Sequence, residues 1–287
     1  MAGTLIAPEK EERKRWSKGL LLLNQQKMTK QQLTTVILLM ALVAVSASAQ
    51  TDNNTTSSSQ TSLSEEWEFT VTPYVFFAGL KGTVGVQRQT ASVNARFPDI
   101  FRNLDFALMG TFEARKGNWL ILTDAMYMSL SGKRVTPSPF FSDIDVEVKE
   151  TIIDPEFGYR VVRRERGTID LLAGVRIWHV KPHLTFQPRI LPLVDVEESK
   201  TWADPVIGAR ATANLSPRVF VTGKFDVGGF GVGSDFTGQA FGGAGFQLKP
   251  RIALVGGYRY LRADYVDEGF VFKTAMNGIV LGAKLKL

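Results

Sequence analysis

The last twelve residues, Met276-Asn-Gly-Ile-Val-Leu-Gly-Ala-Lys-Leu-Lys-Leu287, alternate apolar residues with small or polar ones up to the final position. This period of two is the pattern of a β-strand with one apolar face. The same alternation recurs upstream in segments of roughly ten residues. Four connections between such segments are too short for a crossover helix, namely 115–118, 163–167, 215–218 and 249–251. The sequence therefore predicts an all-β fold, a closed antiparallel barrel.

About ten strands are expected. They are Trp67–Ala78, Leu104–Ala114, Trp119–Leu130, Val146–Val162, Ile169–Val180, Trp202–Asn214, Val219–Phe230, Phe236–Leu248, Ile252–Leu261 and Lys273–Leu287. The longer connections 79–103, 131–144, 181–201 and 262–272 are expected at the end of the barrel opposite the four short turns. The segment 82–95 also alternates weakly and could add a hairpin, so the range is eight to twelve strands.

Most of the basic charge belongs to the N-terminal leader. The whole chain has a net charge of +6, but residues 1–49 contain seven Lys or Arg and three Glu. The remainder has 27 basic and 25 acidic residues. A nucleic-acid partner therefore loses its main support, and none is expected. The absence of cysteine is compatible with an oxidising compartment.

The leader has the layout of a secretory signal peptide. Lys27 and Lys30 precede an apolar run over 33–45, and Ser46-Ala-Ser-Ala49 supplies a small-residue cleavage site. We expect cleavage between Ala49 and Gln50. We also expect Met28 to be the biological start, so that residues 1–27 are an upstream extension and 28–49 the signal peptide helix. The apolar run is short for a permanent transmembrane helix.

The mature chain is expected to have two parts. Residues 50–65 are rich in Thr, Ser, Asn and Gln and should form a flexible periplasmic tail. Residues 66–287 should form the barrel. Within it, Phe106, Leu108 and Phe112 alternate with Asp105, Thr111 and Glu113. In a membrane barrel the apolar face contacts lipid and the polar face lines the lumen.

Charges of both signs are predicted on the lumen face. They are Glu113, Arg115, Asp124, Glu150, Asp154, Glu156, Arg160, Asp170, Arg176, Asp204, Arg210, Lys224, Asp226 and Arg259. Barrels of eight to ten strands have narrow interiors that side chains can fill. Buried ions must be paired, so carboxylate–guanidinium networks that plug the bore are expected. The alternative is that some of these charges line a narrow ion path.

Aromatic residues are expected at both ends of the strands, where membrane barrels carry interfacial girdles. Trp67, Trp119 and Phe220 lie at the predicted periplasmic ends. Trp178, Trp202, Tyr258 and Tyr260 lie near the outer ends. By parity along their strands, Trp178 and Trp202 point inward.

The C-terminus and three internal segments support a family resemblance. Gly282, Leu285 and Leu287 match the spacing of the C-terminal signal read by barrel assembly machinery, although that signal usually ends in an aromatic residue. With the segments 202–210, 226–237 and 256–261, the chain resembles small bacterial outer-membrane β-barrel proteins of the OmpA-like transmembrane type, in an uncharacterised subgroup. The resemblance covers residues 67–287. It implies outer-membrane lipid and the assembly machinery as partners, but no reaction.

Catalytic and ligand motifs do not stand out. The glycine cluster 228–233 has the wrong spacing for a phosphate loop and is interpreted as a hairpin turn. His179 and His183 are separated by Pro182 at a strand end, which does not favour a metal site. We expect no enzyme activity, no cofactor and no metal. The expected protein is a monomeric outer-membrane barrel with a structural or interaction role; the alternatives are a small porin and, last, a lipid-modifying enzyme.

Overall fold

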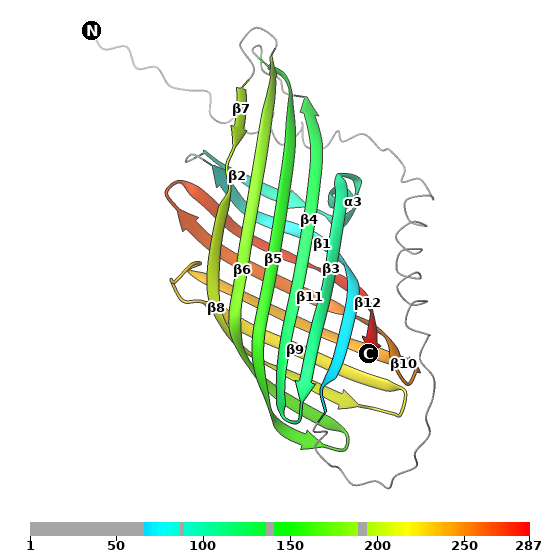
Figure 1. Ribbon diagram of the computed structural model, residues 1–287. Helices are drawn as coiled ribbons and strands as arrows, with labels where there is room; N and C mark the ends of the chain where they lie inside the picture. Colours follow the sequence, from blue (N-terminus) through cyan, green and yellow to red (C-terminus); the bar gives the residue numbers. More distant parts are fainter. Residues whose placement is uncertain (1–65, 87–88, 136–140, 189–193) are drawn as a thin grey trace, which may run out of the picture. The chain divides into compact units, whose positions relative to one another are not determined.

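The computed structural model describes residues 66–86, 89–135, 141–188 and 194–287 (Figure 1). The predicted upstream extension, signal peptide, cleavage site at Ala49–Gln50 and tail lie outside these residues. Among the described residues, no helix has the length and hydropathy needed to cross a bilayer.

Strands make up nearly all of the described chain. The elements are β1 (Glu68–Val86), β2 (Gln89–Ala95), α3 (Phe97–Arg102), β3 (Leu104–Lys116), β4 (Trp119–Val135), β5 (Phe141–Arg164), β6 (Gly167–Pro188), β7 (Val194–Glu197), β8 (Lys200–Asn214), β9 (Val219–Gly229), β10 (Phe236–Lys249), β11 (Ile252–Asp267) and β12 (Phe270–Lys286). The strand pairings are antiparallel, and among the described residues β2 pairs only with β1 and β7 only with β6. The other ten form the barrel wall, as the sequence predicted.

The barrel closes between its first and last strands. β1 pairs with β12 from Thr70 opposite Lys286 to Gly85 opposite Val271. Two glycines of β12 make this close approach possible. A Cβ atom at Gly278 would lie 2.0 Å from the carbonyl oxygen of Phe77, and one at Gly282 would lie 2.9 Å from that of Pro73. The seam therefore depends on residues without side chains.

The two ends of the barrel differ. One end has the four predicted short turns, between β3 and β4, β5 and β6, β8 and β9, and β10 and β11. At the other end β4, β5 and β6 extend well beyond their neighbours, with β7 beside β6 (Figure 1). The predicted connections there were too long, because strands continue into them. The segment 79–103 contains the end of β1, the predicted extra hairpin with β2, and the unpredicted helix α3.

The side chains are arranged inside out relative to a water-soluble protein. Large apolar residues face outward and are exposed, as Leu108 (66%), Ile207 (56%) and Phe225 (57%) illustrate. Asp154, Asp170 and Asp226 are instead buried inside the barrel. An apolar band of this extent on the outer surface is the arrangement of a barrel whose wall contacts lipid.

Candidate functional site in the barrel lumen

The structure places every predicted lumen charge on the inward side of the wall. None of these residues is exposed, and most are buried. They come from β3, β4, β5, β6, β8, β9 and β11. Because the strands alternate in and out, residues that are distant in sequence converge across the narrow bore. The chemistry of the lumen therefore depends on which of these side chains form hydrogen bonds and ion pairs with one another.

A first group meets nearest the four short turns. Asp170 accepts hydrogen bonds from Arg115 Nη2 (3.1 Å), Arg160 Nε (2.8 Å) and Arg210 Nη2 (2.8 Å). Glu113 bridges two of the same cations, through Arg115 Nη2 (3.0 Å) and Arg210 Nη1 (2.6 Å). Charge-assisted bonds of this kind are the strong ones in proteins. Three guanidinium groups and two carboxylates thus cross-link β3, β5, β6 and β8 through the lumen.

A second group is centred on Arg176, whose side chain is fully buried. Its Nε donates to Asp154 Oδ1 at 2.7 Å, and its Nη2 donates to Asp154 Oδ2 at 2.9 Å. Nη2 also donates to Asp226 Oδ1 at 2.9 Å. Its Nη1 donates to Thr237 Oγ1 at 3.1 Å. The guanidinium therefore has partners on β5, β9 and β10, and it crosses the bore instead of lining it.

A third group joins β1 to β4 and β11. Arg259 Nη1 donates to Tyr74 Oη at 2.7 Å and lies 3.3 Å from Asp124 Oδ1, while Tyr74 Oη donates to the same carboxylate at 2.8 Å. Beside it, Lys224 on β9 forms an ion pair with Glu156 on β5. The three groups together are called the ionic layer below. Its members are Glu113, Arg115, Asp124, Asp154, Glu156, Arg160, Asp170, Arg176, Arg210, Lys224, Asp226 and Arg259.

Lys224 pairs with Glu156 through an ammonium group instead of a guanidinium, and two predicted lumen charges, Asp204 and Glu150, form no ion pair among the described residues, which corrects the expectation for them. Asp204 accepts hydrogen bonds from the backbone N–H and the hydroxyl of Ser234, and Trp202 Nε1 donates to that hydroxyl at 2.9 Å. The glycine-rich turn after β9 brings Ser234 into the lumen, using positive φ at Gly229 and Gly231. Glu150 is buried, and its Oε1 has no hydrogen-bond partner among the described residues.

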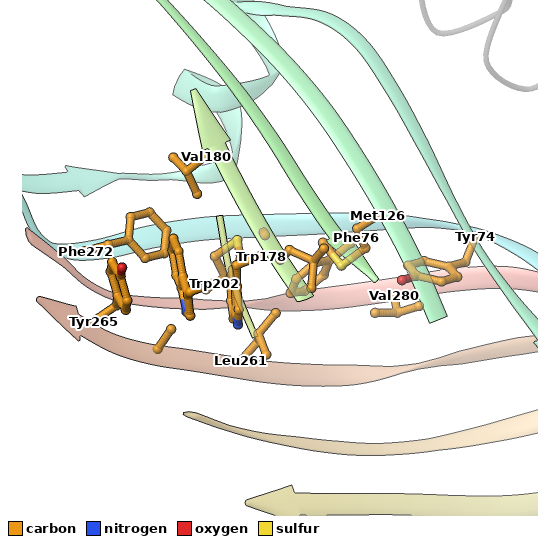
Figure 2. Close-up of a cluster of buried hydrophobic side chains, with 14 of the residues drawn as sticks. Tyr74, Phe76, Met126, Trp178, Val180, Trp202, Leu261, Tyr265, Phe272 and Val280 are labelled. Atoms are coloured by element: carbon orange, nitrogen blue, oxygen red, sulfur yellow. The ribbon is translucent and has the colours of Figure 1, made fainter. Parts of the chain in front are cut away.

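Beyond the ionic layer the bore is filled by aromatic rings (Figure 2). Trp178, Trp202 and Tyr265 are stacked, with ring centroids 5.7 and 4.1 Å apart and interplanar angles of 8°. Phe270 and Phe272 contact the stack at angles near 60°. These five residues, called the aromatic layer below, lie inside the barrel on the side away from the short turns. Their burial confirms the inward direction predicted for Trp178 and Trp202.

A cavity of about 170 Å³ is present in the lumen. Its charged lining consists of Glu113, Asp124, Arg210, Lys224, Arg259 and Lys284, with Thr70, Thr72, Thr111 and Thr222 adding hydroxyl groups. Phe220 also lines it, so this residue lies at the predicted end of the barrel but faces inward, and it is not part of an outer girdle. Its ring lies 6.0 Å from Lys284 Nζ. Leu122, Phe241, Val255 and Val280 also line the cavity, which therefore combines apolar walls with a few charged and hydroxyl groups.

Sequence reasoning missed Tyr74, Lys284, Ser234, Tyr265, Phe270 and Phe272. Parity along the strand could have placed Tyr74 and Lys284, which lie within predicted strands. Phe270, Phe272 and Tyr265 fell in the segment 262–272 that was interpreted as a loop.

No group of three or more potential metal ligands occurs in the described part of the chain. His183 lies on the outer extension of β6, opposite Glu197 of β7. His179 lies within the wall, opposite Thr201 of β8, and its Nδ1 is 2.7 Å from Thr201 Oγ1.

The C-terminal residues predicted to form the assembly signal lie at the closing seam. Gly282 and Leu285 pair with β1 opposite Tyr74 and Val71. Leu285 is buried, whereas Leu287 is exposed and donates its backbone N–H to the Phe69 carbonyl oxygen at 2.9 Å. The segment is thus the last part of the ladder that completes the barrel.

Comparison with solved structures returns bacterial outer-membrane barrels. The translocator domain of the autotransporter NalP from Neisseria meningitidis matches with a TM-score of 0.42 and 11% identity, over 89% of this chain and 96% of that one. The attachment invasion locus protein of Yersinia pestis gives 0.33 and 12%, over 78% and 99%. A major outer membrane protein of Thermus thermophilus gives 0.33 and 12%, over 77% and 99%. No family model and no curated protein matches the sequence. At these scores the matches carry no argument about function.

Proposed function

We propose that the protein is an integral barrel of the bacterial outer membrane whose lumen is closed to solutes. The apolar outer band and the buried interior charges support membrane insertion, because the same surface in water would be a large exposed apolar patch. The signal peptide expected over 28–49 directs the chain to the envelope. In the membrane the four short turns should face the periplasm, because short turns lie on the periplasmic side of bacterial barrels.

The proposal of a closed lumen rests on one observation. The ionic layer and the aromatic layer follow one another along the bore. Arg176 and Trp178 are two residues apart on β6, both at 0% exposure, and each belongs to a different layer. A solute would have to break a bidentate ion pair and then separate stacked rings. With conduction blocked, the parts left to act are the outer extension of β4, β5 and β6 and the lipid-facing wall. The role we propose is therefore structural, or an interaction made by these exposed parts.

The proposal includes a monomer and no catalysis. All ten wall strands have partners on both sides in the closed ring, so a second copy has no edge at which to join the wall, and edges remain at β2 and β7 outside it. Ser234 and Asp204 are bonded to each other inside the lumen, while His179 alternates with the inward-facing Trp178 and Val180 and lies on the other face of β6. This separation gives no support to a Ser/His/Asp enzyme. Gly282, Leu285 and Leu287 are proposed to be read by the barrel assembly machinery.

A small porin is the second candidate. The observation in its favour is the 170 Å³ cavity, whose charged and hydroxyl groups could contribute to an aqueous path. For conduction, the aromatic layer would have to move aside. The two candidates differ in whether a solute can cross the closed state of the barrel.

Liposome swelling distinguishes them. The refolded protein, shown to be inserted by heat-modifiable gel mobility, is reconstituted into vesicles that are diluted into small sugars or amino acids. A closed barrel gives the swelling rate of protein-free vesicles, while a general porin as positive control gives a fast rate. Swelling that increases in proportion to the protein would favour the porin. Failure to insert at all would overturn the membrane location.

A further inference from the structure

The rim of the barrel that bears the four short turns is strongly basic. This turn rim comprises the residues of those turns and the adjacent ends of β1 and β12. Its exposed cations are Lys116, Arg163, Arg164, Arg166, Arg218, Lys249, Arg251 and Lys286. Among the described residues, its acidic side chains are those of Glu66, Glu68 and Glu165. Every one of the four turns contributes at least one cation, so positive charge surrounds the mouth on all sides.

The charge of the turn rim is mostly not neutralised within the protein. Among the described residues, the only rim cation in an ion pair is Lys286, whose Nζ lies 3.2 Å from Glu68 Oε1. Arg163 instead donates from Nη2 to the carbonyl oxygen of Gly117 (2.9 Å) and to Asn118 Oδ1 (3.1 Å) in the neighbouring turn. These bonds hold a guanidinium at the surface without cancelling its charge.

The opposite end of the barrel has a different arrangement. Its cations are largely paired with local carboxylates. The pairs are Arg96–Asp99 (3.7 Å), Lys149–Glu147 (2.7 Å), Lys181–Glu197 (2.6 Å), Lys200–Asp267 (2.9 Å) and Arg262–Asp264 (2.7 Å). The excess of unpaired cations is therefore a property of one rim and does not reflect the composition of the whole chain.

Aromatic residues on the outer wall lie next to the basic turns. Trp67 stacks on Phe69, whose ring stacks on Phe112, both with centroids 6.2 Å apart. Trp119 follows the first turn and contacts Tyr159 at 4.6 Å. Exposed rings of this kind mark the depth of the membrane–water interface in barrels. The turn cations lie within a few residues of these aromatic residues in sequence. We therefore expect them at the depth of the lipid phosphate groups.

We propose that the turn rim is a binding surface for anionic phospholipid headgroups in the membrane leaflet that it contacts. The inference rests on the proposed membrane location and adds lipid selectivity to it. Guanidinium and ammonium groups bind phosphate through charge-assisted hydrogen bonds, and an additional negative headgroup charge strengthens the attraction. Phospholipid is favoured over a soluble acidic partner because the cations follow the lipid-facing girdle around the barrel instead of forming one compact patch.

The test measures lipid selectivity at the surface of the inserted full-length protein. Spin-labelled phosphatidylglycerol and spin-labelled phosphatidylcholine are compared in phosphatidylcholine vesicles, and the immobilised fraction in electron spin resonance gives their relative association constant. We expect the wild type to prefer the anionic lipid by roughly threefold or more at low salt. A variant with one change per turn, K116Q/R164Q/R218Q/R251Q, should reduce the ratio to near one.

A matched control neutralises four exposed cations elsewhere on the barrel, in K81Q/R96Q/R102Q/K273Q. It changes the net charge equally and should keep most of the preference. Equal loss in both variants, or a wild-type ratio near one, would overturn the proposal. Binding of soluble polyglutamate through the turn rim with no lipid preference would indicate an acidic macromolecule instead. Failure of heat-modifiable insertion into pure phosphatidylcholine would count against the membrane location, whereas insertion without selectivity would count against this inference alone.

Discussion

The ionic layer and the aromatic layer obstruct the same bore by opposite means. In the ionic layer each group depends on partners from other strands, as Arg176 depends on Asp154 and Asp226. In the aromatic layer Trp202 packs on Trp178 and Tyr265 through non-directional contacts. Loss of one ion leaves another charge buried and unpaired, whereas loss of one ring leaves a void. The difference teaches that the proposed closure of the lumen rests on two kinds of interaction.

The largest effect is expected in the ionic layer. Replacing Arg176 by Met should lower the free energy of unfolding by about 3–5 kcal/mol, because two buried carboxylates lose their cation. Urea unfolding followed by gel mobility measures the change. The triple variant D154N/R176M/D226N removes the unpaired charges and should recover most of the loss. If the free energy of unfolding of R176M is within about 1 kcal/mol of the wild-type value, the ion pairs of Arg176 are not needed for stability.

The aromatic layer should respond next. Replacing Trp202 by Ala should cost about 3 kcal/mol, since it removes a ring stacked between two others and creates a cavity. Trp119, which is exposed on the outer wall, provides the matched control, and Trp119→Ala should cost clearly less. The same unfolding assay applies. Equal losses at the two positions would mean that the stack contributes nothing beyond ordinary contact.

A smaller effect is expected where the two layers meet. Ser234→Ala removes a hydroxyl that donates to Asp204 and accepts from Trp202 Nε1. Leaving these buried groups short of a partner should cost about 1–3 kcal/mol. Ser216→Ala is the control, because that hydroxyl accepts hydrogen bonds only in an exposed turn. If both serine variants unfold at the same urea concentration, the link between the glycine-rich turn and the aromatic layer is not structural.

The smallest effect lies outside the membrane span, in the hairpin between β11 and β12. The hydrogen bond from Lys200 holds the pKa of the Asp267 carboxyl below its ordinary value. A lowered folded-state pKa adds stability above the unfolded pKa of about 4, and this contribution is lost as the pH falls through the folded value. Lys200→Met should move the carboxyl titration in an NMR experiment back toward the ordinary value. An unchanged titration would show that the pair is not formed in solution.

The strands of the wall could be predicted from the sequence, but some of the side chains that they bring together in the lumen could not. Ten strands and their faces could be predicted because a period of two is a local pattern. The aromatic layer was missed because Tyr265, Phe270 and Phe272 lie beyond the predicted ends of their strands, in the segment 262–272. Strand ends at a membrane surface carry polar residues that resemble loops.

The pairing inside the lumen could not be predicted either. Arg176 is 22 residues from Asp154 and 50 from Asp226, and their meeting depends on the stagger of strands around the closed barrel. Nor does alternation indicate that Asp204 is bonded to a serine from the turn after β9. The inward direction of a charge follows from local sequence, but its partner depends on the whole barrel.

Planar-bilayer conductance of the refolded protein tests the closed lumen most directly, once heat-modifiable mobility has confirmed that it is folded. The two filled layers predict a flat baseline, with no reproducible steps. Discrete steps whose size changes when Arg176 or Glu113 is neutralised would place an ion path through the ionic layer and contradict the closed barrel.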